Sequence, residues 1–95
     1  MAKTYNFAVV GLGMGGHHCK AIAAAKGANL AAVCDLDPER LDKFVKQYGC
    51  KGYARYADVL VDPAIDVVNI VTESGKHAEM GIQAARAGKH MIVEK

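Results

Sequence analysis

The chain has 95 residues, of which 52% are hydrophobic and 23% are charged, and its formal net charge is +2. This length fits one small globular domain, and the mild charge balance gives no reason to expect nucleic acid or an anionic membrane as a partner. No apolar run approaches the roughly 20 residues that span a bilayer, and the first residues lack the apolar centre of a signal peptide.

The N-terminal third predicts a strand, a helix and a second strand. Residues 5–10 are an apolar, β-branched run that leads into a glycine-rich turn. Residues from about 15 to 26 are rich in alanine, which favours a helix, and Gly27 is a natural left-handed stop. Residues 30–34 predict a short second strand, which ends at Asp35.

The middle of the chain predicts a helix followed by two weaker elements. Asp37 is interpreted as a helix N-cap rather than a ligand, and Pro38 as the first helical position. Apolar residues then recur at helical spacing on one face: Leu41, Phe44, Val45 and Tyr48. Gly49 ends this helix, residues 50–54 are at best a short strand, and residues 56–61 form one or two helical turns.

The C-terminal third returns to strand and helix. Residues 65–71 are an almost continuous β-branched run, as expected of a strand covered on both faces. A helix then runs to about residue 87, and residues 90–93 form the last strand. Five alternations of strand and helix predict an α/β, doubly wound Rossmann fold with a parallel sheet of order 3-2-1-4-5. Ligands of such a sheet bind outside the carboxyl ends of the strands, at the switch between strands 1 and 4.

The glycine-rich turn has the G-x-G-x-x-G pattern of dinucleotide-binding sites, with a strand before it and a helix after it. Gly11 permits the tight turn, Gly13 lets the backbone approach a pyrophosphate, and Gly16 is expected to let the helix pack closely on the sheet. The backbone amides of Leu12 and Met14 are expected to face the phosphates, helped by the helix dipole.

An acidic residue stands 19 positions after Gly16, at the end of the second predicted strand. The carboxylate of Asp35 can accept hydrogen bonds from both adenosine ribose hydroxyls, which favours NAD over NADP because a 2′-phosphate would be repelled. The alternative is a solvated aspartate at a strand end. Arg40 lies near enough in sequence to leave the use of both cofactors open.

The cysteines and histidines do not indicate a metal site. His17, His18 and Cys19 are adjacent, and neighbouring residues on a helix point about 100° apart, so they do not converge on one ion. The three cysteines are widely spaced without a C-x-x-C pair, which indicates free thiols in a reducing compartment, and we expect a cytoplasmic protein.

The C-terminal third resembles one family closely. Residues 66–72 match its pattern D-x-V-x-I-x-T-P, His77 matches a following histidine, and residues 87–95 match A-G-K-H-V-x-x-E-K-P up to the lysine. The family is Gfo/Idh/MocA, named for glucose–fructose oxidoreductase and inositol dehydrogenase. The resemblance runs over essentially the whole chain. The departure that stands out is Glu73, which replaces the usual proline.

The resemblance implies an NAD(P)-dependent dehydrogenase acting on a small-molecule substrate: a sugar, an inositol or a nucleotide sugar. Family members carry a second α/β domain that supplies most substrate contacts. Residues 1–95 are therefore expected to be the NAD(P)-binding Rossmann domain of a longer protein, which is expected to be homo-oligomeric when complete.

The resemblance also implies roles for four further residues. Thr72 and His77 match positions near the nicotinamide half of the cofactor, and Glu94 matches one that lines the nicotinamide ribose. Lys95 matches the family's catalytic lysine, which can polarise the reacting hydroxyl and assist proton removal. The alternatives are a structural role for His77 at a helix N-terminus, a plain strand end at Glu94 and a solvated chain end at Lys95.

Three function classes remain open from the sequence. The oxidoreductase is favoured because the Glu94-Lys95 ending has no purpose in a protein that only binds the cofactor. The alternatives are a non-catalytic module that senses dinucleotides and a relative used for assembly.

Overall fold

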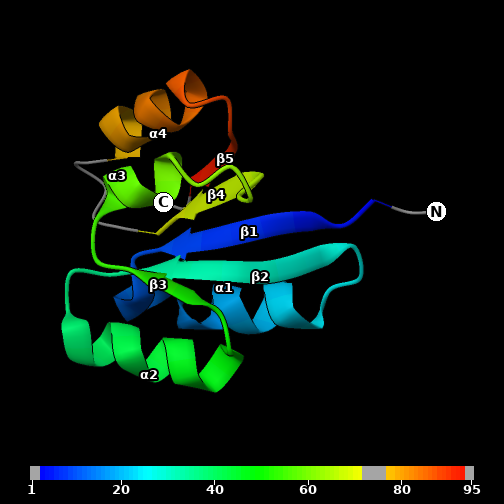
Figure 1. Cartoon of the computed structure of the whole chain (residues 1–95), viewed down its shortest axis with the longest axis vertical. Helices are drawn as coiled ribbons and strands as arrows, with labels where there is room; N and C mark the ends of the chain where they lie inside the picture. Colours follow the sequence, from blue (N-terminus) through cyan, green and yellow to red (C-terminus); the bar gives the residue numbers. More distant parts are fainter. Residues whose placement is uncertain (1–2, 72–76, 94–95) are drawn as a thin grey trace.

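The computed structural model describes residues 3–71 and 77–93. Its strands form one parallel sheet in the order β3-β2-β1-β4-β5, which confirms the predicted Rossmann topology (Figure 1). The strands are β1 (Tyr5–Val10), β2 (Ala28–Cys34), β3 (Lys51–Tyr53), β4 (Val67–Ile70) and β5 (His90–Val93).

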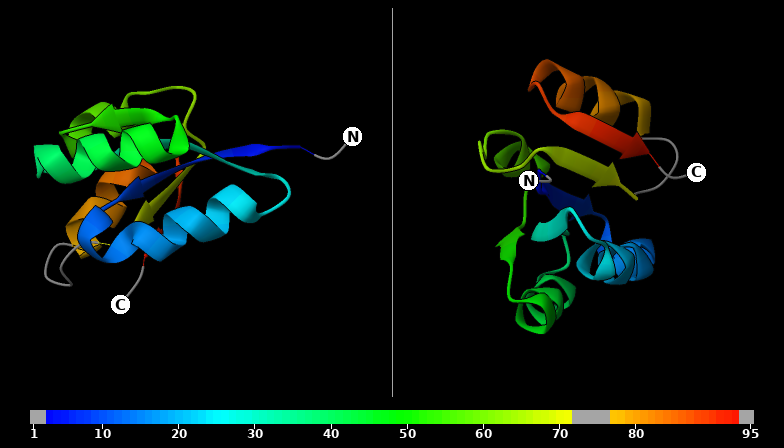
Figure 2. Two further views of the ribbon diagram at one scale, coloured as in Figure 1. Left: turned by 90° about the horizontal axis from the view of Figure 1, so that it is seen from below. Right: turned by 90° about the vertical axis from the view of Figure 1, so that its right-hand side faces the viewer.

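Helices cover both faces of this sheet, as parallel strands joined by crossovers require. Helices α1 and α2 lie on one face, and α3 and α4 lie on the other (Figures 1 and 2). Their bounds are α1 (Leu12–Ala24), α2 (Pro38–Tyr48), α3 (Tyr56–Leu60) and α4 (His77–Arg86).

The sheet separates two hydrophobic cores because successive side chains of a strand point to opposite faces. In β1, Ala8 and Val10 face the core under α3, while Val9 faces the core under α1. All three are buried. The continuous apolar runs in the sequence therefore reflect burial on both faces.

Helix α1 begins at Leu12, about three residues earlier than predicted. The reason is Gly11, whose φ of 95° and ψ of 86° turn the chain from strand to helix at a single residue. A left-handed φ of this kind costs glycine nothing, so the glycine-rich stretch is itself the first turn of the helix. The N-terminus of α1 consequently lies directly at the end of β1.

Helix α2 begins as predicted. The Asp37 side chain accepts hydrogen bonds from the backbone N–H groups of Glu39 and Arg40, at 3.0 and 3.3 Å. Pro38 follows at the first helical position, and Gly49 ends the helix with a φ of 63°. The N-cap interpretation of Asp37 is thereby confirmed.

The glycine that lets α1 approach the sheet is Gly15, and the prediction that Gly16 has this role is wrong. A Cβ added at Gly15 would stand 2.9 Å from Cγ1 of the buried Val9 and 3.6 Å from Cβ of Val71. A Cβ added at Gly16 would instead meet Cζ of Phe44, in α2, at 3.4 Å. Gly16 therefore lies at the contact between the two helices.

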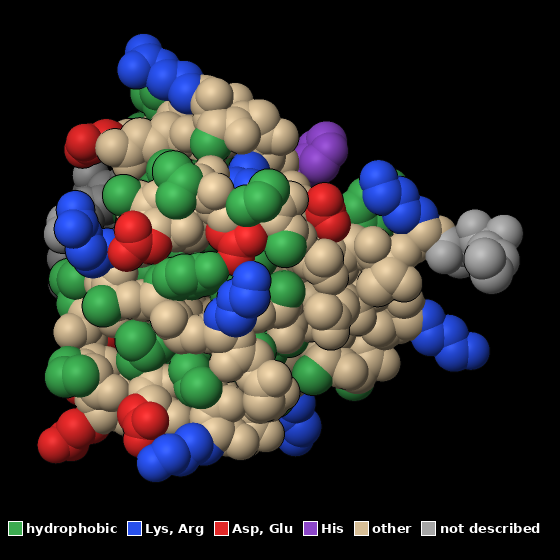
Figure 3. All heavy atoms as spheres, in the orientation of Figure 1, with side chains coloured by type: hydrophobic (Ala, Val, Ile, Leu, Met, Phe, Trp, Pro, Cys, Tyr) green, Lys and Arg blue, Asp and Glu red, His purple; other side chains and the backbone are tan. Residues whose placement is uncertain are grey.

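The visible surface carries charges of both signs in an interspersed pattern (Figure 3), in keeping with the net charge of +2. Within residues 3–71 and 77–93, no helix is both long enough and apolar enough to cross a bilayer.

A buried carboxylate fixes the loop that follows α3. Asp62 is 8% exposed. Its Oδ2 accepts hydrogen bonds from the Tyr53 hydroxyl at 2.6 Å and from Lys51 Nζ at 3.2 Å, and its Oδ1 accepts one from the Ala64 N–H at 2.9 Å. The Tyr53 hydroxyl, the Ala64 N–H and Lys51 together outweigh burial and lower the pKa of Asp62 to about 2.

The Gly15 contact predicts opposite effects for two adjacent glycines. Gly15→Ala should lower the free energy of unfolding by about 1–3 kcal/mol, because the new methyl group overpacks against Val9. Gly16→Ala should leave stability unchanged or raise it by up to about 1 kcal/mol, since alanine is the better helix former. Urea denaturation of both variants checks this, and equal effects would contradict the assignment.

The Asp62 cluster predicts a pH dependence of stability. The folded-state pKa lies below the ordinary value of 3.8, so the contribution is complete above that value and is lost as pH falls toward 2. Asp62→Asn should reduce the free energy of unfolding at pH 7 by on the order of 2 kcal/mol and flatten its change between pH 4 and 2. Asp42→Asn, at an exposed carboxylate paired with Lys46, is the matched control and should change little. Parallel pH profiles for parent and Asp62→Asn would contradict this role.

Candidate functional site at the carboxyl edge of the sheet

The glycine turn and the end of β2 meet at one edge of the sheet. The Gly11 N–H donates to the Cys34 carbonyl at 2.9 Å, and the Asp35 N–H donates to the Tyr53 carbonyl at 3.2 Å. These bonds extend the β1–β2 and β2–β3 pairings by one residue each. Asp35 is thereby placed beside the first turn of α1.

The Asp35 carboxylate is held by two backbone donors. Its Oδ2 accepts a hydrogen bond from the Leu12 N–H at 2.9 Å, and its Oδ1 accepts one from the Asp37 N–H at 2.8 Å. Arg40 Nη1 lies 3.3 Å from Oδ2, and the Asp35 side chain is only 9% exposed. The solvated alternative for Asp35 is therefore excluded.

Asp35 is ionised despite its low exposure. Burial acts to raise the pKa, but hydrogen bonds from the Asp37 and Leu12 amides and the ion pair with Arg40 outweigh it and lower the pKa of this carboxyl group. An ionised carboxylate accepts hydrogen bonds only, so Asp35 can receive hydroxyl donors.

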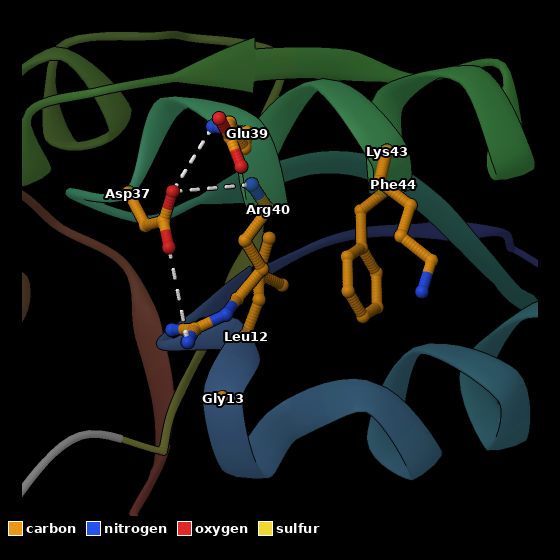
Figure 4. A pocket seen from close by; sticks show the side chains of 7 residues that line it. All are labelled: Leu12, Gly13, Asp37, Glu39, Arg40, Lys43 and Phe44. Atoms are coloured by element: carbon orange, nitrogen blue, oxygen red, sulfur yellow. Dashed lines mark hydrogen bonds and ion pairs between the residues drawn. The ribbon is translucent and has the colours of Figure 1, made fainter.

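A pocket of about 480 Å³ opens beside this carboxylate, between the glycine turn and α2 (Figure 4). This volume is in the ordinary range for small-molecule sites. The lining residues are Leu12 and Gly13 from α1, and Asp37, Glu39, Arg40, Lys43 and Phe44 from the start of α2. The Arg40 side chain reaches from α2 toward the turn. The pocket therefore combines apolar surface with charges of both signs.

The residues at this edge fit an adenine dinucleotide. A Cβ added at Gly13 would lie 3.1 Å from Nη1 at the end of the Arg40 side chain, so the glycine leaves room between the turn and this flexible group. The exposed Gly13 backbone allows a pyrophosphate to approach closely. The adjacent helix N-terminus offers amide donors to the phosphates, and the Asp35 carboxylate offers an acceptor to the ribose hydroxyls.

The structure brings some of the predicted site residues together and leaves others out. Gly11, Gly13 and Asp35 share one edge, and the N–H of Leu12 is already engaged by Asp35. The role of Leu12 toward the phosphates stays a prediction. The predicted packing of Gly16 on the sheet is wrong, and its membership of the cofactor site stays a prediction. Three further predicted site residues, Thr72, Glu94 and Lys95, lie outside the described residues. The side chains of Met14 and His77 are also not described, although the backbone of His77 begins α4.

Sequence reasoning missed two features of this edge. Leu36, directly after Asp35, is 83% exposed, and its only signal was a large apolar residue between two aspartates. Phe44 was expected only on the apolar face of α2, yet it also lines the pocket. Helical spacing places Phe44 on that face but cannot show that the face extends to the turn.

The thiols offer no reactive group at this site. Burial raises the pKa of Cys19 to about 11 and that of Cys34 to about 12, so both remain protonated at neutral pH. Both are buried and belong to the two cores, as expected. In the described part of the chain, no three His, Cys, Asp or Glu side chains are grouped to hold a metal ion.

Known proteins are similar to this chain in sequence and in fold. Scyllo-inositol 2-dehydrogenase (NAD(+)) of Bacillus subtilis is 38% identical over 91 residues, which cover 93% of this chain and 27% of that protein. The structure of scyllo-inositol dehydrogenase from Lactobacillus casei, with bound NAD(H) and scyllo-inositol, is similar with a TM-score of 0.92 and 35% identity. That match covers 98% of this chain and 28% of the other.

A third relative has a nucleotide sugar bound. The WlbA dehydrogenase from Bordetella pertussis, in complex with NADH and UDP-GlcNAcA, has a TM-score of 0.91 and 32% identity, over 98% of this chain and 30% of its own. The chain thus spans less than a third of the length of these relatives.

A family model described as "Oxidoreductase family, NAD-binding Rossmann fold" matches residues 5–95. Together with the parallel sheet, the glycine turn and the relatives above, this match shows that the chain belongs to the Gfo/Idh/MocA oxidoreductase family and forms its NAD-binding Rossmann fold.

Proposed function

We propose that this chain is the cofactor-binding part of an NAD-dependent dehydrogenase that transfers hydride between nicotinamide and a hydroxyl-bearing carbon of an inositol, a sugar or a nucleotide sugar. The observation that carries the proposal is the ionised Asp35 carboxylate, held 2.9 Å from the Leu12 N–H at the mouth of the glycine turn. This arrangement suits the ribose diol of an adenine dinucleotide.

The adenosine half of the cofactor would lie across the carboxyl edge of β1 and β2. Asp35 accepts the ribose hydroxyls, and Gly13 leaves the backbone open to the pyrophosphate. The positive end of the α1 dipole favours the phosphate charge. Bound NAD would supply the hydride acceptor, while these residues fix its position.

Preference for NAD(H) over NADP(H) follows from charge. A 2′-phosphate would enter beside a carboxylate whose pKa is lowered and which therefore stays negative at neutral pH. The bound NAD(H) of the Lactobacillus casei relative and the bound NADH of the Bordetella pertussis relative support this preference.

The catalytic end would be formed by the residues that follow β4 and β5. These strands lie side by side in parallel, so Thr72 and Glu94 follow adjacent strand ends. We propose that Thr72, His77 and Glu94 contact the nicotinamide half and that Lys95 polarises the reacting hydroxyl.

A longer protein is proposed to complete the substrate site. Three apolar residues of the edge strand β5, Met91, Ile92 and Val93, are 40–43% exposed. On the adjacent strand, Asn69 Oδ1 is buried with no hydrogen-bond partner among the residues that the structure describes. The exposed apolar surface of β5 favours cover by further protein. The inositol and nucleotide sugar in the two relatives support a polyhydroxylated substrate.

The dinucleotide site is tested by Gly13→Val. The new side chain would meet only the end of the flexible Arg40, so the fold should be retained, but it would occupy the space that the pyrophosphate needs. NADH affinity should fall by on the order of a hundredfold or more, as measured by fluorescence titration. Ala23→Val, which adds the same side chain at an exposed position of α1 away from the turn, is the control and should bind as the parent does. Equal binding by Gly13→Val would place the cofactor elsewhere.

The hydride-transfer proposal is tested at Lys95 in the intact protein. Lys95→Ala should lower kcat by roughly two or more orders of magnitude while changing NADH affinity little, because the lysine acts on the reacting hydroxyl. Lys26→Ala, at an exposed residue after α1, serves as the control. The measurement is steady-state kinetics with polyols and sugars, beside an NADH titration. NADH binding without turnover of any such substrate by the parent would favour the sensing alternative, and unchanged kcat in Lys95→Ala would remove the lysine's role.

A further inference from the structure

Lys89 links two segments of the chain at the edge of the sheet opposite the glycine turn. It lies in the turn between α4 and β5, and its Nζ donates hydrogen bonds to the carbonyl groups of Asp62 and Ile65, each at 2.8 Å. Both carbonyls belong to the loop between α3 and β4. Hydrogen bonds from an ammonium are stronger than those between neutral groups, so the start of β5 is firmly attached to the chain that precedes β4. This lysine is part of the A-G-K-H stretch of the sequence, which has no role in the proposed function.

The residues on either side of Lys89 direct the chain from α4 into β5. Gly88, with a φ of 77°, turns the chain after α4, and the Lys89 N–H donates to the Ala84 carbonyl at 3.0 Å. The His90 N–H donates to the Asp66 carbonyl at 3.1 Å, at the point where the pairing of β4 with β5 begins. The backbone and the side chain of this turn together fix the residue at which β5 starts.

The strand that Lys89 anchors is held less by burial than its neighbour is. β5 is an edge strand of four residues that pairs with β4 (Figure 1). All four residues of β4 are buried, whereas Met91, Ile92 and Val93 of β5 are 40–43% exposed. Register is strongly specified where a face of a strand is buried and weakly where neither face is. The attachment at its start therefore contributes more to the register of β5 than burial does.

The register of β5 determines where the residues after it lie. Lys95 comes two residues after Val93, the last residue of β5. A slip of one residue would move the strand by about 3.3 Å and exchange its two faces. A displacement of about 1 Å at a reacting group can lower a rate about a hundredfold. A change at Lys89 can therefore affect catalysis without any contact to cofactor or substrate.

We propose that Lys89 is a positioning residue of the dehydrogenase, whose ammonium fixes the start and the register of β5 and so determines where this strand places Glu94 and Lys95. This role rests on the proposed hydride-transfer function, in which Lys95 acts on the reacting hydroxyl. Lys89 itself lies at the opposite edge of the sheet and takes no part in the chemical step.

A second lysine holds the same loop without touching β5. Lys51 Nζ donates to Asp62 Oδ2 at 3.2 Å, and its side chain is 59% exposed. Lys51 begins β3, which forms the other edge of the sheet (Figure 1). Loss of either lysine removes a support of the loop before β4, but only loss of Lys89 detaches the start of β5.

The test is Lys89→Met in the intact protein, which keeps the apolar stem and removes the donors. We expect kcat with the best polyol or sugar substrate to fall by on the order of tenfold or more, because Lys95 is displaced. The NADH dissociation constant, from fluorescence titration, should stay within about threefold of the parent, since Asp35 and Gly13 lie at the ends of other strands. Amide hydrogen exchange of residues 90–93 should become faster, because the strand opens more easily.

Three further variants complete the design. Lys51→Met loosens the same loop from the other side and should leave kcat and the exchange of β5 unchanged. Lys89→Arg keeps the charge and the donors and should recover most of kcat. Lys89→Gln keeps two neutral donors and should lower kcat less than Lys89→Met does, so it provides the measurement if the methionine variant does not fold.

The outcomes separate this inference from the function on which it rests. If the parent binds NADH but turns over no polyol or sugar, the proposed function fails and the role of Lys89 with it. If the parent is active but kcat is unchanged in the Lys89 variants, or Lys51→Met lowers it equally, the function stands and Lys89 is not a positioning residue. A lower kcat without faster exchange in β5 would overturn the inference as well. A loss of kcat confined to the Lys89 variants, with faster exchange in β5 and unchanged NADH affinity, supports it.

Discussion

The hydrogen bond from the Leu12 N–H to the Asp35 carboxylate joins two chain turns on which the whole site depends. Leu12 is the first residue of α1, and Asp35 is the first residue after β2. The bond is possible because Gly11 reverses the chain direction in a single left-handed residue, which brings the start of α1 to the edge of the sheet. One backbone conformation therefore sets both the phosphate end and the ribose end of the dinucleotide site.

The sequence predicted the structure best where a feature depends only on residues close to it in the chain. Asp37, Pro38 and Gly49 bound α2 as predicted, because capping depends on neighbouring backbone groups only. The sheet order follows from alternating strands and helices, since few topologies satisfy right-handed crossovers. The position of Asp35 at the turn follows from the same order, because the carboxyl ends of adjacent parallel strands meet at one edge.

The sequence was less informative where a contact depends on which face of a helix a residue occupies. Gly15 and Gly16 are adjacent, and either could face the sheet; the choice depends on whether the helix begins at residue 12 or about residue 15. A helix rotates by about 100° per residue, so an error of this size in the start changes the buried face. The Arg40–Asp35 pair was out of reach for a related reason, since a long side chain can take several directions from the same helical position.

Two nearly buried carboxylates of this domain show how the same chemistry serves stability or binding. Asp62 accepts hydrogen bonds from the Tyr53 hydroxyl at 2.6 Å and the Ala64 N–H at 2.9 Å, and a third from Lys51, whose side chain is 59% exposed, at 3.2 Å. Asp35 receives two of its three donors from backbone and the third from an exposed arginine at 3.3 Å. In both cases the exposed cation is the donor whose loss should cost the fold least, but only Asp35 lies beside the glycine turn. A carboxylate can therefore be fixed in position by backbone and still keep one acceptor site for a ligand, provided that the group occupying this site is charged, exposed and weakly held.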